Sequence, residues 1–284
     1  MAPVWLITGA SKGIGFVLAQ KVLESGHRVI GTIRNPSANA DAVATLESKG
    51  GKVIELELGD AQASIHAKIR AAEQIYGQID ILVNNAGFSE LGTIEDVTEK
   101  EIANLMATNV NGPIFTTQAM LPGMRARKSG LIINVSSLMG IAGMPGGSIY
   151  AATKFAIEGI TECLAEELAP FNIDVLCVAP GLFYTGAVAA TKFHVAPEYE
   201  GTAVAGVRDM VAGIDKSQAS DPAKAANRIF DYVAGQGAAG ALKGKTRRLL
   251  LGPDCIQGVE KKIETLKADL ELSRPIGIST RFDS

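Results

Sequence analysis

The sequence of this 284-residue chain predicts an α/β fold in which helices cover both faces of a parallel sheet. Short runs rich in β-branched and aliphatic residues alternate with longer amphipathic stretches. Strands that alternate with helices form parallel sheets through right-handed crossovers. Hydrophobic residues make up 47% of the chain and charged residues 20%, which allows a sizeable core. Neither an internal repeat nor a low-complexity linker divides the sequence, so we expect one domain.

Four strands and three helices are expected in the first part of the chain. Each strand is a short apolar run, and these runs are residues 4–8, 27–33, 52–58 and 79–85. Helices are expected over 14–25 and 40–49, and a third helix follows the third strand with Asp60 as its N-cap.

The second part of the chain continues the alternation. The expected elements are a helix over 99–127, a strand over 131–137, a helix over 148–169, and strands over 173–180 and 248–252. Gly112-Pro113 predicts a bend in the first of these helices, because proline cannot donate a helical hydrogen bond. Two segments fall outside the pattern. Residues 182–220 form an insertion of small and aromatic residues, and residues 256–284 form a charged helix with a tail.

Composition excludes several classes of partner. The net charge is −3 and the basic runs are short, so we expect no nucleic-acid partner. The three cysteines show no CxxC or Cys/His spacing and the three histidines are dispersed, so no metal site is expected. No run of about 18 apolar residues could span a membrane, and the N-terminus lacks the pattern of a signal peptide. We therefore expect a cytoplasmic protein with no membrane partner.

Residues 8–15, TGASKGIG, connect the first strand to the first helix. Glycines let the backbone turn sharply and approach a ligand, and a helix N-terminus attracts an anion. A tight strand–helix connection is the simplest interpretation, but the position after the first strand favours dinucleotide binding. The spacing is GxxxGxG rather than GxGxxG. The cofactor-binding residues expected in this turn are Gly9, Ser11, Lys12, Gly13, Ile14 and Gly15.

Further motifs follow in order: NNAG at 84–87, Ser137, YAATK at 150–154 and PG at 180–181. Together with the glycine turn, they make residues 4–252 resemble the short-chain dehydrogenase/reductase family. The resemblance implies a Rossmann-type, doubly wound sheet of about seven parallel strands. It also implies NAD(P)-dependent redox chemistry at carbonyls or alcohols, and a homodimer or homotetramer.

Tyr150 and Lys154 lie four residues apart, so a helix places them on one face. A nearby cation favours the phenolate, which predicts that Lys154 lowers the pKa of Tyr150 towards neutrality. The resemblance implies that Tyr150 gives its proton to the carbonyl oxygen as hydride arrives. It implies that Lys154 tunes this acid and binds the nicotinamide ribose. A surface tyrosine over a lysine stem is the structural alternative.

The resemblance supplies two more catalytic candidates. Ser137 matches the family serine that hydrogen-bonds the substrate oxygen, whereas its neighbour Ser136 better fits a serine that satisfies its own turn. Asn109 matches the family asparagine whose backbone helps to hold a water near the lysine. Asn111 is the competing residue, and a helix kink is the structural alternative for both.

Other positions are assigned to the cofactor by the same resemblance. Asn84, Ala86 and Gly87 are expected near the adenosine ribose, although they could simply stabilise their loop. Pro180 and Gly181 shape the loop under the nicotinamide. Thr185 matches the family residue that binds the carboxamide, or else it caps a helix.

The end of the second strand predicts NADP(H) as the cofactor. NAD-selective enzymes place an acidic residue there to bind the ribose hydroxyl, whereas a cation suits the 2′-phosphate of NADP. Ile33 occupies the acidic position and Arg34 follows it, while Lys12 in the glycine turn offers a second cation. Glu57 stands where the family usually has an aspartate near adenine, and Leu58 follows it.

These observations predict an NADPH-dependent oxidoreductase that transfers hydride between NADP(H) and a small hydrophobic ketone or secondary alcohol. Residues 182–220 would form a mobile lid, with apolar side chains at Leu182, Phe183, Val188, Phe193 and Val195. The family motifs assign no role to the lid residues His194 and Tyr199. A ketoreductase for carrier-bound acyl chains, with Arg127-Lys128 facing an acidic carrier, is one alternative. A catalytically idle NADP-sensing protein is the other.

Overall fold

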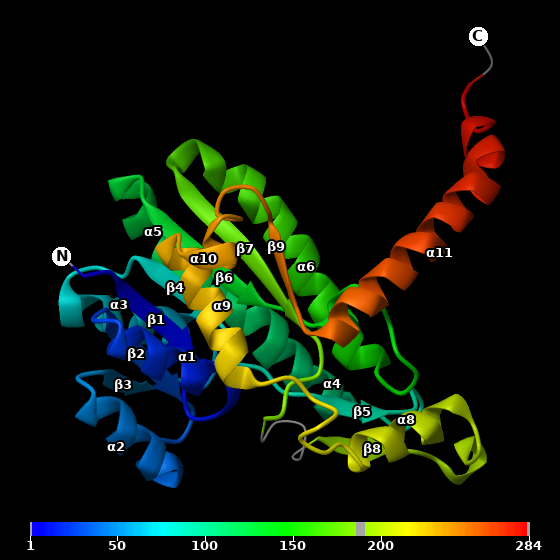
Figure 1. The fold of residues 1–284 in the computed structure, drawn as a ribbon, viewed down its shortest axis with the longest axis horizontal. Helices are drawn as coiled ribbons and strands as arrows, with labels where there is room; N and C mark the ends of the chain where they lie inside the picture. Colours follow the sequence, from blue (N-terminus) through cyan, green and yellow to red (C-terminus); the bar gives the residue numbers. More distant parts are fainter. Residues whose placement is uncertain (1, 186–190, 283–284) are drawn as a thin grey trace.

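A seven-stranded parallel sheet forms the centre of the protein, in a computed structural model that describes residues 2–185 and 191–282 (Figure 1). The strand order is β3-β2-β1-β4-β6-β7-β9, which confirms the predicted sheet. Its strands are β1 (Val4–Thr8), β2 (Arg28–Ile33), β3 (Lys52–Glu55), β4 (Ile81–Asn84), β6 (Gly130–Val135), β7 (Ile173–Pro180) and β9 (Arg248–Leu251). The strand order reverses between β1 and β4, and ligands of such sheets bind at the carboxyl ends beside this reversal.

Helices cover both faces of the sheet. In β1, Trp5 and Ile7 pack into one core while Leu6 packs into the other, as the two-residue period of a strand requires. Helices α1 (Gly13–Glu24), α2 (Ala40–Ser48) and α9 (Pro222–Ala234) contribute to the first core. Helices α3 (Gln62–Tyr76), α5 (Gly112–Arg127) and α6 (Ser148–Leu168) contribute to the second. The short α10 (Gly237–Gly240) follows α9 (Figure 1).

The start of α3 corrects one expectation. Asp60 does not cap this helix: α3 begins at Gln62, and its N-cap is Ala61 without a capping side chain. The chain still turns at Asp60, whose N–H donates to Glu57, so the carboxylate lies outside the first helical turn. It instead accepts hydrogen bonds from Ser64 Oγ at 3.2 Å and Lys68 Nζ at 3.5 Å.

The predicted long helix over 99–127 is interrupted. Helix α4 (Glu99–Met106) is joined to α5 by a π-helical turn at Ala107–Asn111. The predicted bend therefore falls just before Gly112-Pro113. Pro113 has no N–H to donate back to the preceding turn, which allows this turn to widen. Such π-turns occur often at functional sites, and this one contains Asn109.

Residues 182–220 contain more regular structure than the sequence indicates. Strand β8 (Lys192–His194) pairs in parallel with β5 (Glu90–Gly92), and helix α8 (Ala203–Ala212) follows. Neither three-residue strand was predicted, because so short a run carries no periodicity. The C-terminal helix α11 (Pro253–Ile278) starts earlier than expected and extends away from the sheet (Figure 1). Among the described helices, none is long and apolar enough to cross a membrane.

Candidate active site

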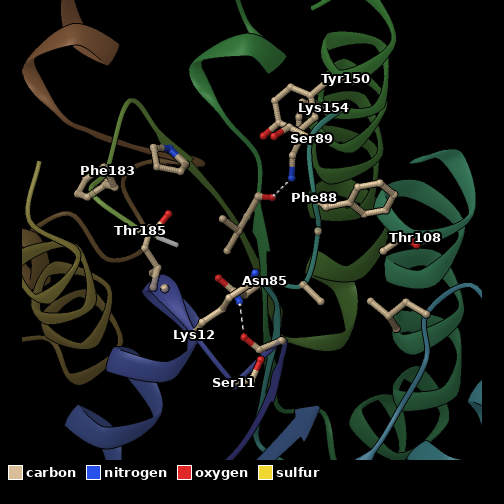
Figure 2. Close-up of a pocket in the computed structure, with 18 of the residues that line it drawn as sticks. Ser11, Lys12, Asn85, Phe88, Ser89, Thr108, Tyr150, Lys154, Phe183 and Thr185 are labelled. Atoms are coloured by element: carbon tan, nitrogen blue, oxygen red, sulfur yellow. Dashed lines mark hydrogen bonds between the residues drawn. The ribbon is translucent and has the colours of Figure 1, made fainter. Parts of the chain in front are cut away.

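A cavity of about 430 Å³ opens at the carboxyl ends of the central strands. Figure 2 shows Tyr150 and Lys154 at one end of this cavity and Ser11 and Lys12 at the other. Most residues assigned to the cofactor line the cavity. They are Gly9, Ser11, Lys12, Gly13, Ile14, Arg34, Glu57, Leu58, Ala86, Gly87, Tyr150, Lys154, Pro180, Gly181 and Thr185. Residues from six separate segments of the sequence therefore meet around one space.

The glycine turn presents backbone to the cavity. Gly9 has a φ of +70°, and a Cβ built on it would lie 2.8 Å from Ala86 Cα, so a side chain is excluded twice over. Lys12 is the N-cap of α1 without a capping side-chain bond, and the first turn carries no acidic residue. The positive end of this helix is therefore not neutralised locally, as suits an anionic ligand.

Two of the predicted cofactor contacts are wrong. Asn84 is buried inside the protein: its Nδ2 donates to Asn134 Oδ1 at 2.9 Å, and its Oδ1 accepts from Thr116 Oγ1 at 2.7 Å. It ties β4 to β6 and α5, which is the architectural role left open above. Gly15 is also buried, packed so closely against Asn85 that no side chain would fit.

The neighbour of Asn84 takes the place at the cavity. Asn85 lines it (Figure 2), and its Nδ2 donates to Thr8 O at 2.9 Å. The last residue of β4 is Asn84, so the two asparagines point differently. Two identical neighbouring residues do not indicate which one points into the core. Only the alternation of side chains along the preceding strand could have distinguished Asn84 from Asn85.

Tyr150 and Lys154 share one face of α6, as predicted. Lys154 is 6% exposed, and its Nζ donates to Val135 O at 2.9 Å and lies 5.8 Å from the Tyr150 ring centroid. Burial lowers the pKa of Lys154 to about 8. Burial raises the pKa of Tyr150, and a hydrogen bond with Ser137 opposes that shift. The predicted lowering of the Tyr150 pKa is wrong here, because desolvation of the phenol outweighs the hydrogen bond with Ser137.

Of the two serines after β6, Ser137 lies beside Tyr150, as predicted, but it also makes the turn hydrogen bond that was expected of Ser136. Ser137 reaches Tyr150 and also accepts a hydrogen bond from Met139 N at 3.1 Å, so it is the serine that satisfies its own turn. Ser136 is 2% exposed and forms part of the cavity wall. The structure thus brings Ser137 to the phenol, whereas the Ser136 hydroxyl is buried beside Gly140.

Asn109 lies behind the cavity wall, within the π-helical turn. Its Oδ1 accepts from Phe88 N at 3.1 Å, while its Nδ2 donates to Phe88 O at 2.9 Å and to Thr153 Oγ1 at 3.2 Å. These bonds tie the loop after β4 to α6. A Cβ on Gly87 would lie 3.1 Å from Asn109 Oδ1 and 3.6 Å from Lys154 Nζ, so this loop packs closely against both side chains.

The far end of the cavity is cationic. The Arg34 side chain is 76% exposed, and its Nε lies 3.7 Å from Glu57 Oε2. Glu57 also accepts from Gly59 N at 3.0 Å, which orients its carboxylate. Ile33 is 1% exposed and turns into the core, so no acidic side chain ends β2. Within residues 2–185 and 191–282, no cluster of three His, Cys, Asp or Glu could hold a metal.

The loop after β7 is held from the C-terminal helix. Asp254, in the first turn of α11, accepts a hydrogen bond from Leu182 N at 2.7 Å, and Gly181 N donates to Leu251 O at 2.8 Å. Gly181 packs against the Asp254 carboxylate too closely for any side chain. Thr185 lies over Gly13 (Figure 2). The alternative role of Thr185 as a helix cap depends on residues 186–190, which lie outside the described part of the chain.

Residues of the predicted lid lie in different environments. Phe183 is buried in the first core and lines the cavity, and Phe193 packs against Gly146. The lid is joined to the loop after β4 by a 2.8 Å hydrogen bond between Thr191 Oγ1 and Ser89 Oγ. His194 faces Glu101, at 3.5 Å, and lies outside the cavity lining. Tyr199 lies beside Glu95, and Val188 falls outside the described residues.

Several cavity residues were missed from the sequence. Half of them extend a motif that was recognised: Asn85, Phe88, Ser89 and Glu90 continue the loop after β4, and Leu182 and Phe183 continue the loop after β7. Thr32, Leu56, Thr108, Val135, Ser136 and Thr191 complete this group. For Phe88, Ser89, Glu90, Leu182 and Phe183, the signal available was their position two to five residues beyond a predicted strand end.

Comparison with known proteins gives a consistent result. A profile of the short chain dehydrogenases matches residues 3–194. The chain is 31% identical over 286 residues to the oxidoreductase BOA17 of Botryotinia fuckeliana, covering 99% of this chain and 100% of that protein. It is 45% identical over 184 residues, 64% of each chain, to the 3-ketodihydrosphingosine reductase of Bacteroides thetaiotaomicron.

A solved structure extends this likeness over the whole fold. A short-chain dehydrogenase from Streptomyces avermitilis has a TM-score of 0.87 and 36% identity, covering 99% of this chain and 98% of that one. The motifs of the glycine turn, the loop after β4 and α6 lie within the matched residues. The chain therefore belongs to the short-chain dehydrogenase/reductase family of oxidoreductases.

Proposed function

We propose that this protein transfers hydride between NADP(H) and a small hydrophobic ketone or secondary alcohol. The observation that carries this proposal is one continuous cavity with Tyr150 and Lys154 at one end and Lys12 at the other, and with Arg34 also in its lining. An acid suited to carbonyl reduction and a cationic end suited to a 2′-phosphate thus belong to the same site.

The residues present fit a dinucleotide phosphate. Gly9 leaves room beside Ala86 for close approach, and the N-terminus of α1 offers uncapped backbone donors to an anion. Arg34 and Lys12 provide exposed cations, and the buried Ile33 replaces the acid that would repel a phosphate. When bound, NADP(H) supplies or accepts the hydride.

The proton chemistry belongs to the chain itself. Because burial raises the pKa of Tyr150, its hydroxyl keeps its proton at neutral pH and can donate it to a carbonyl oxygen. Ser137 fixes the phenol by a hydrogen bond and can donate to the same oxygen. Lys154 has a pKa of about 8, so a positive charge beside the phenol favours the phenolate that donation leaves behind.

Several features support an uncharged, apolar substrate. Val135, Phe88 and Phe183 lie on the walls of the cavity, and the carboxylate of Glu90 on the same wall would repel an anion. One relative, 45% identical over 184 residues, is named for the reduction of a ketone, 3-ketodihydrosphingosine. A carrier-bound acyl chain is less well supported, because Arg127 is held by Ile79 O and lies 3.6 Å from Glu73.

Turnover of a ketone panel tests the proposed reaction. We expect NADPH oxidation, followed by absorbance, to give kcat/KM values at least about tenfold higher for bulky uncharged ketones than for keto acids of similar size. Replacing Glu90 with glutamine should narrow that ratio, because the repelling charge is removed while the side-chain volume is kept. A preference for keto acids in the wild type would contradict the proposal. No turnover of any ketone would favour the idle binding protein.

Cofactor selection depends on Arg34. We expect Arg34→Ala to raise the KM for NADPH about tenfold to a hundredfold, since a charge-assisted hydrogen bond contributes about 1.5–3 kcal/mol. The KM for NADH should hardly change, because NADH lacks the 2′-phosphate. Ile33→Asp combined with Arg34→Ala should then favour NADH.

The partner of Arg34 provides the matched control. Glu57→Gln keeps the side chain's size but releases Arg34 from its ion pair, so the KM for NADPH should stay equal or fall. If Arg34→Ala changed the KM for NADPH and the KM for NADH equally, this residue would not bind the 2′-phosphate.

A further inference from the structure

Helix α11 leaves the body of the protein near Gly258. A Cβ on this glycine would lie 2.6 Å from Leu138 Cδ1, so the helix is packed closely there. Beyond it the helix extends away from the sheet (Figure 1), and residues 264–278 are all exposed. Helices are stabilised mainly by packing an apolar face, so a projecting helix of this length needs a surface to pack against.

An apolar seam runs along α11. Its members are spaced three and four residues apart, the heptad pattern of a coiled coil: Ile256, Val259, Ile263, Leu266 and Leu270. The exposed fractions are 45% for Ile263, 52% for Leu266 and 54% for Leu270. The seam spans about 21 Å of helix. In heptad terms, Ile263 and Leu270 stand at position a and Leu266 at position d.

We propose that this seam binds the same seam of a second copy of the chain, with the two helices antiparallel. The flanking charges determine the orientation. Lys262 and Asp269 occupy position g, and Glu260 and Lys267 occupy position e. In an antiparallel pair, g faces g and e faces e. With Ile263 level with Leu266 of the second copy, Lys262 then lies beside Asp269 and Lys267 beside Glu260. Two-fold symmetry repeats both pairs, giving four attractions.

A parallel pair gains no net attraction from the same charges. There position g faces the next position e of the partner, which places Lys262 against Lys267 and Asp269 against Arg274 on both sides of the seam. Two repulsions then offset two attractions, whereas the antiparallel pair has four attractions. The flanking charges of α11 therefore favour the antiparallel orientation.

The charge pattern also distinguishes a second copy from a lipid surface. Residues 260–274 carry four acidic and four basic side chains, interspersed along the helix. Helices that lie on membranes concentrate lysine and arginine on their polar face. A helix that pairs with a second copy of itself instead carries both signs of charge, placed so that opposite charges meet across the pair.

The antiparallel arrangement also accounts for one apolar residue beside the seam. Ile276, at position g, is 69% exposed. In the pair, this residue of one copy lies level with the first turn of α11 in the other. That turn holds Asp254, so the end of one chain would cover the base of the second copy's cavity loop.

Sedimentation velocity of the full chain tests the pairing. The double variant Ile263→Asp/Leu266→Asp should raise the dissociation constant of the assembly at least about a hundredfold, because charges replace two apolar layers. The measured mass should fall by half at micromolar protein. The matched control Thr265→Asp/Ala268→Asp adds the same charges to the outer face and should leave the mass unchanged.

Charge reversal tests the orientation. Lys262→Glu should weaken the antiparallel pair about tenfold, since it places two acids together, and adding Asp269→Lys should restore it. In a parallel pair, Lys262→Glu would instead strengthen association with Lys267. A monomeric wild type, an unchanged mass for the seam variant, or stronger association of Lys262→Glu would each overturn the proposal. So would a seam variant that loses vesicle binding while keeping its mass.

Discussion

Tyr150→Phe is expected to lower the rate of ketone reduction at least ~10²-fold, the scale of a lost general acid. The variant removes only the hydroxyl that hydrogen-bonds with Ser137, and the ring can keep its place 5.8 Å from Lys154 Nζ. NADPH absorbance would follow turnover, and the NADPH dissociation constant should change little because most of the cavity wall is unaffected.

Tyr184→Phe is the matched control for this experiment. Tyr184 is 51% exposed and lies outside the cavity lining, so the same chemical change there should leave turnover within about twofold. A Tyr150→Phe enzyme that reduces its ketone at nearly the wild-type rate would remove this phenol from the mechanism. An equal loss in both variants would point to a general effect of removing a hydroxyl.

Arg248→Met is expected to lower the free energy of unfolding by about 3 kcal/mol. Arg248 donates to Glu158 Oε2 from Nε at 2.8 Å, and the Glu158 side chain is only 7% exposed. Removing the guanidinium leaves a carboxylate buried without its cation, which typically costs about 3–5 kcal/mol. We expect the lower end, because 34% of the Arg248 side chain is exposed.

The preceding residue offers a matched control. Arg247 pairs with Glu166 on the surface, where the two side chains are 60% and 68% exposed. Exposed pairs contribute about 0–1 kcal/mol, so Arg247→Met should have little effect on urea-induced unfolding. A double variant, Arg248→Met with Glu158→Leu, should recover much of the lost stability, because the buried charge is then absent. Similar losses for Arg247→Met and Arg248→Met would contradict this account.

Several strands of the sheet, such as β1 and β4, could be predicted because they are continuous buried runs. Residues 173–180, for example, lie almost entirely inside, and the structure ends β7 at Pro180 as predicted. The short pair β5 and β8 could not be predicted in this way. Each has three residues, and their pairing depends on residues a hundred positions apart that only the folded chain brings together.

The residues of the candidate site could be predicted where a sequence motif determines their position. They could be predicted much less well where strand register or the surrounding packing determines whether a side chain reaches the cavity. Gly9 and Tyr150 were assigned correctly to the cavity, since a turn and a helical repeat define their places. Asn84 was misplaced because one residue of register separates a core side chain from a cavity side chain. The pKa of Tyr150 could not be predicted either, because burial depends on packing that the local sequence does not contain.

The hydrogen bond from Leu182 N to Asp254 has a consequence for how the protein is made. The loop after β7 lies about two thirds of the way along the chain, yet the carboxylate that holds it arrives with the start of α11. Strand β9, whose Leu251 accepts the hydrogen bond from Gly181, is synthesised just before that helix. A chain growing from its N-terminus can form β1 to β7 on the ribosome but must wait for residue 254 before this wall of the cavity is fixed. Nascent chains released before that point would hold the glycine turn and Tyr150 but lack the anchored loop between them.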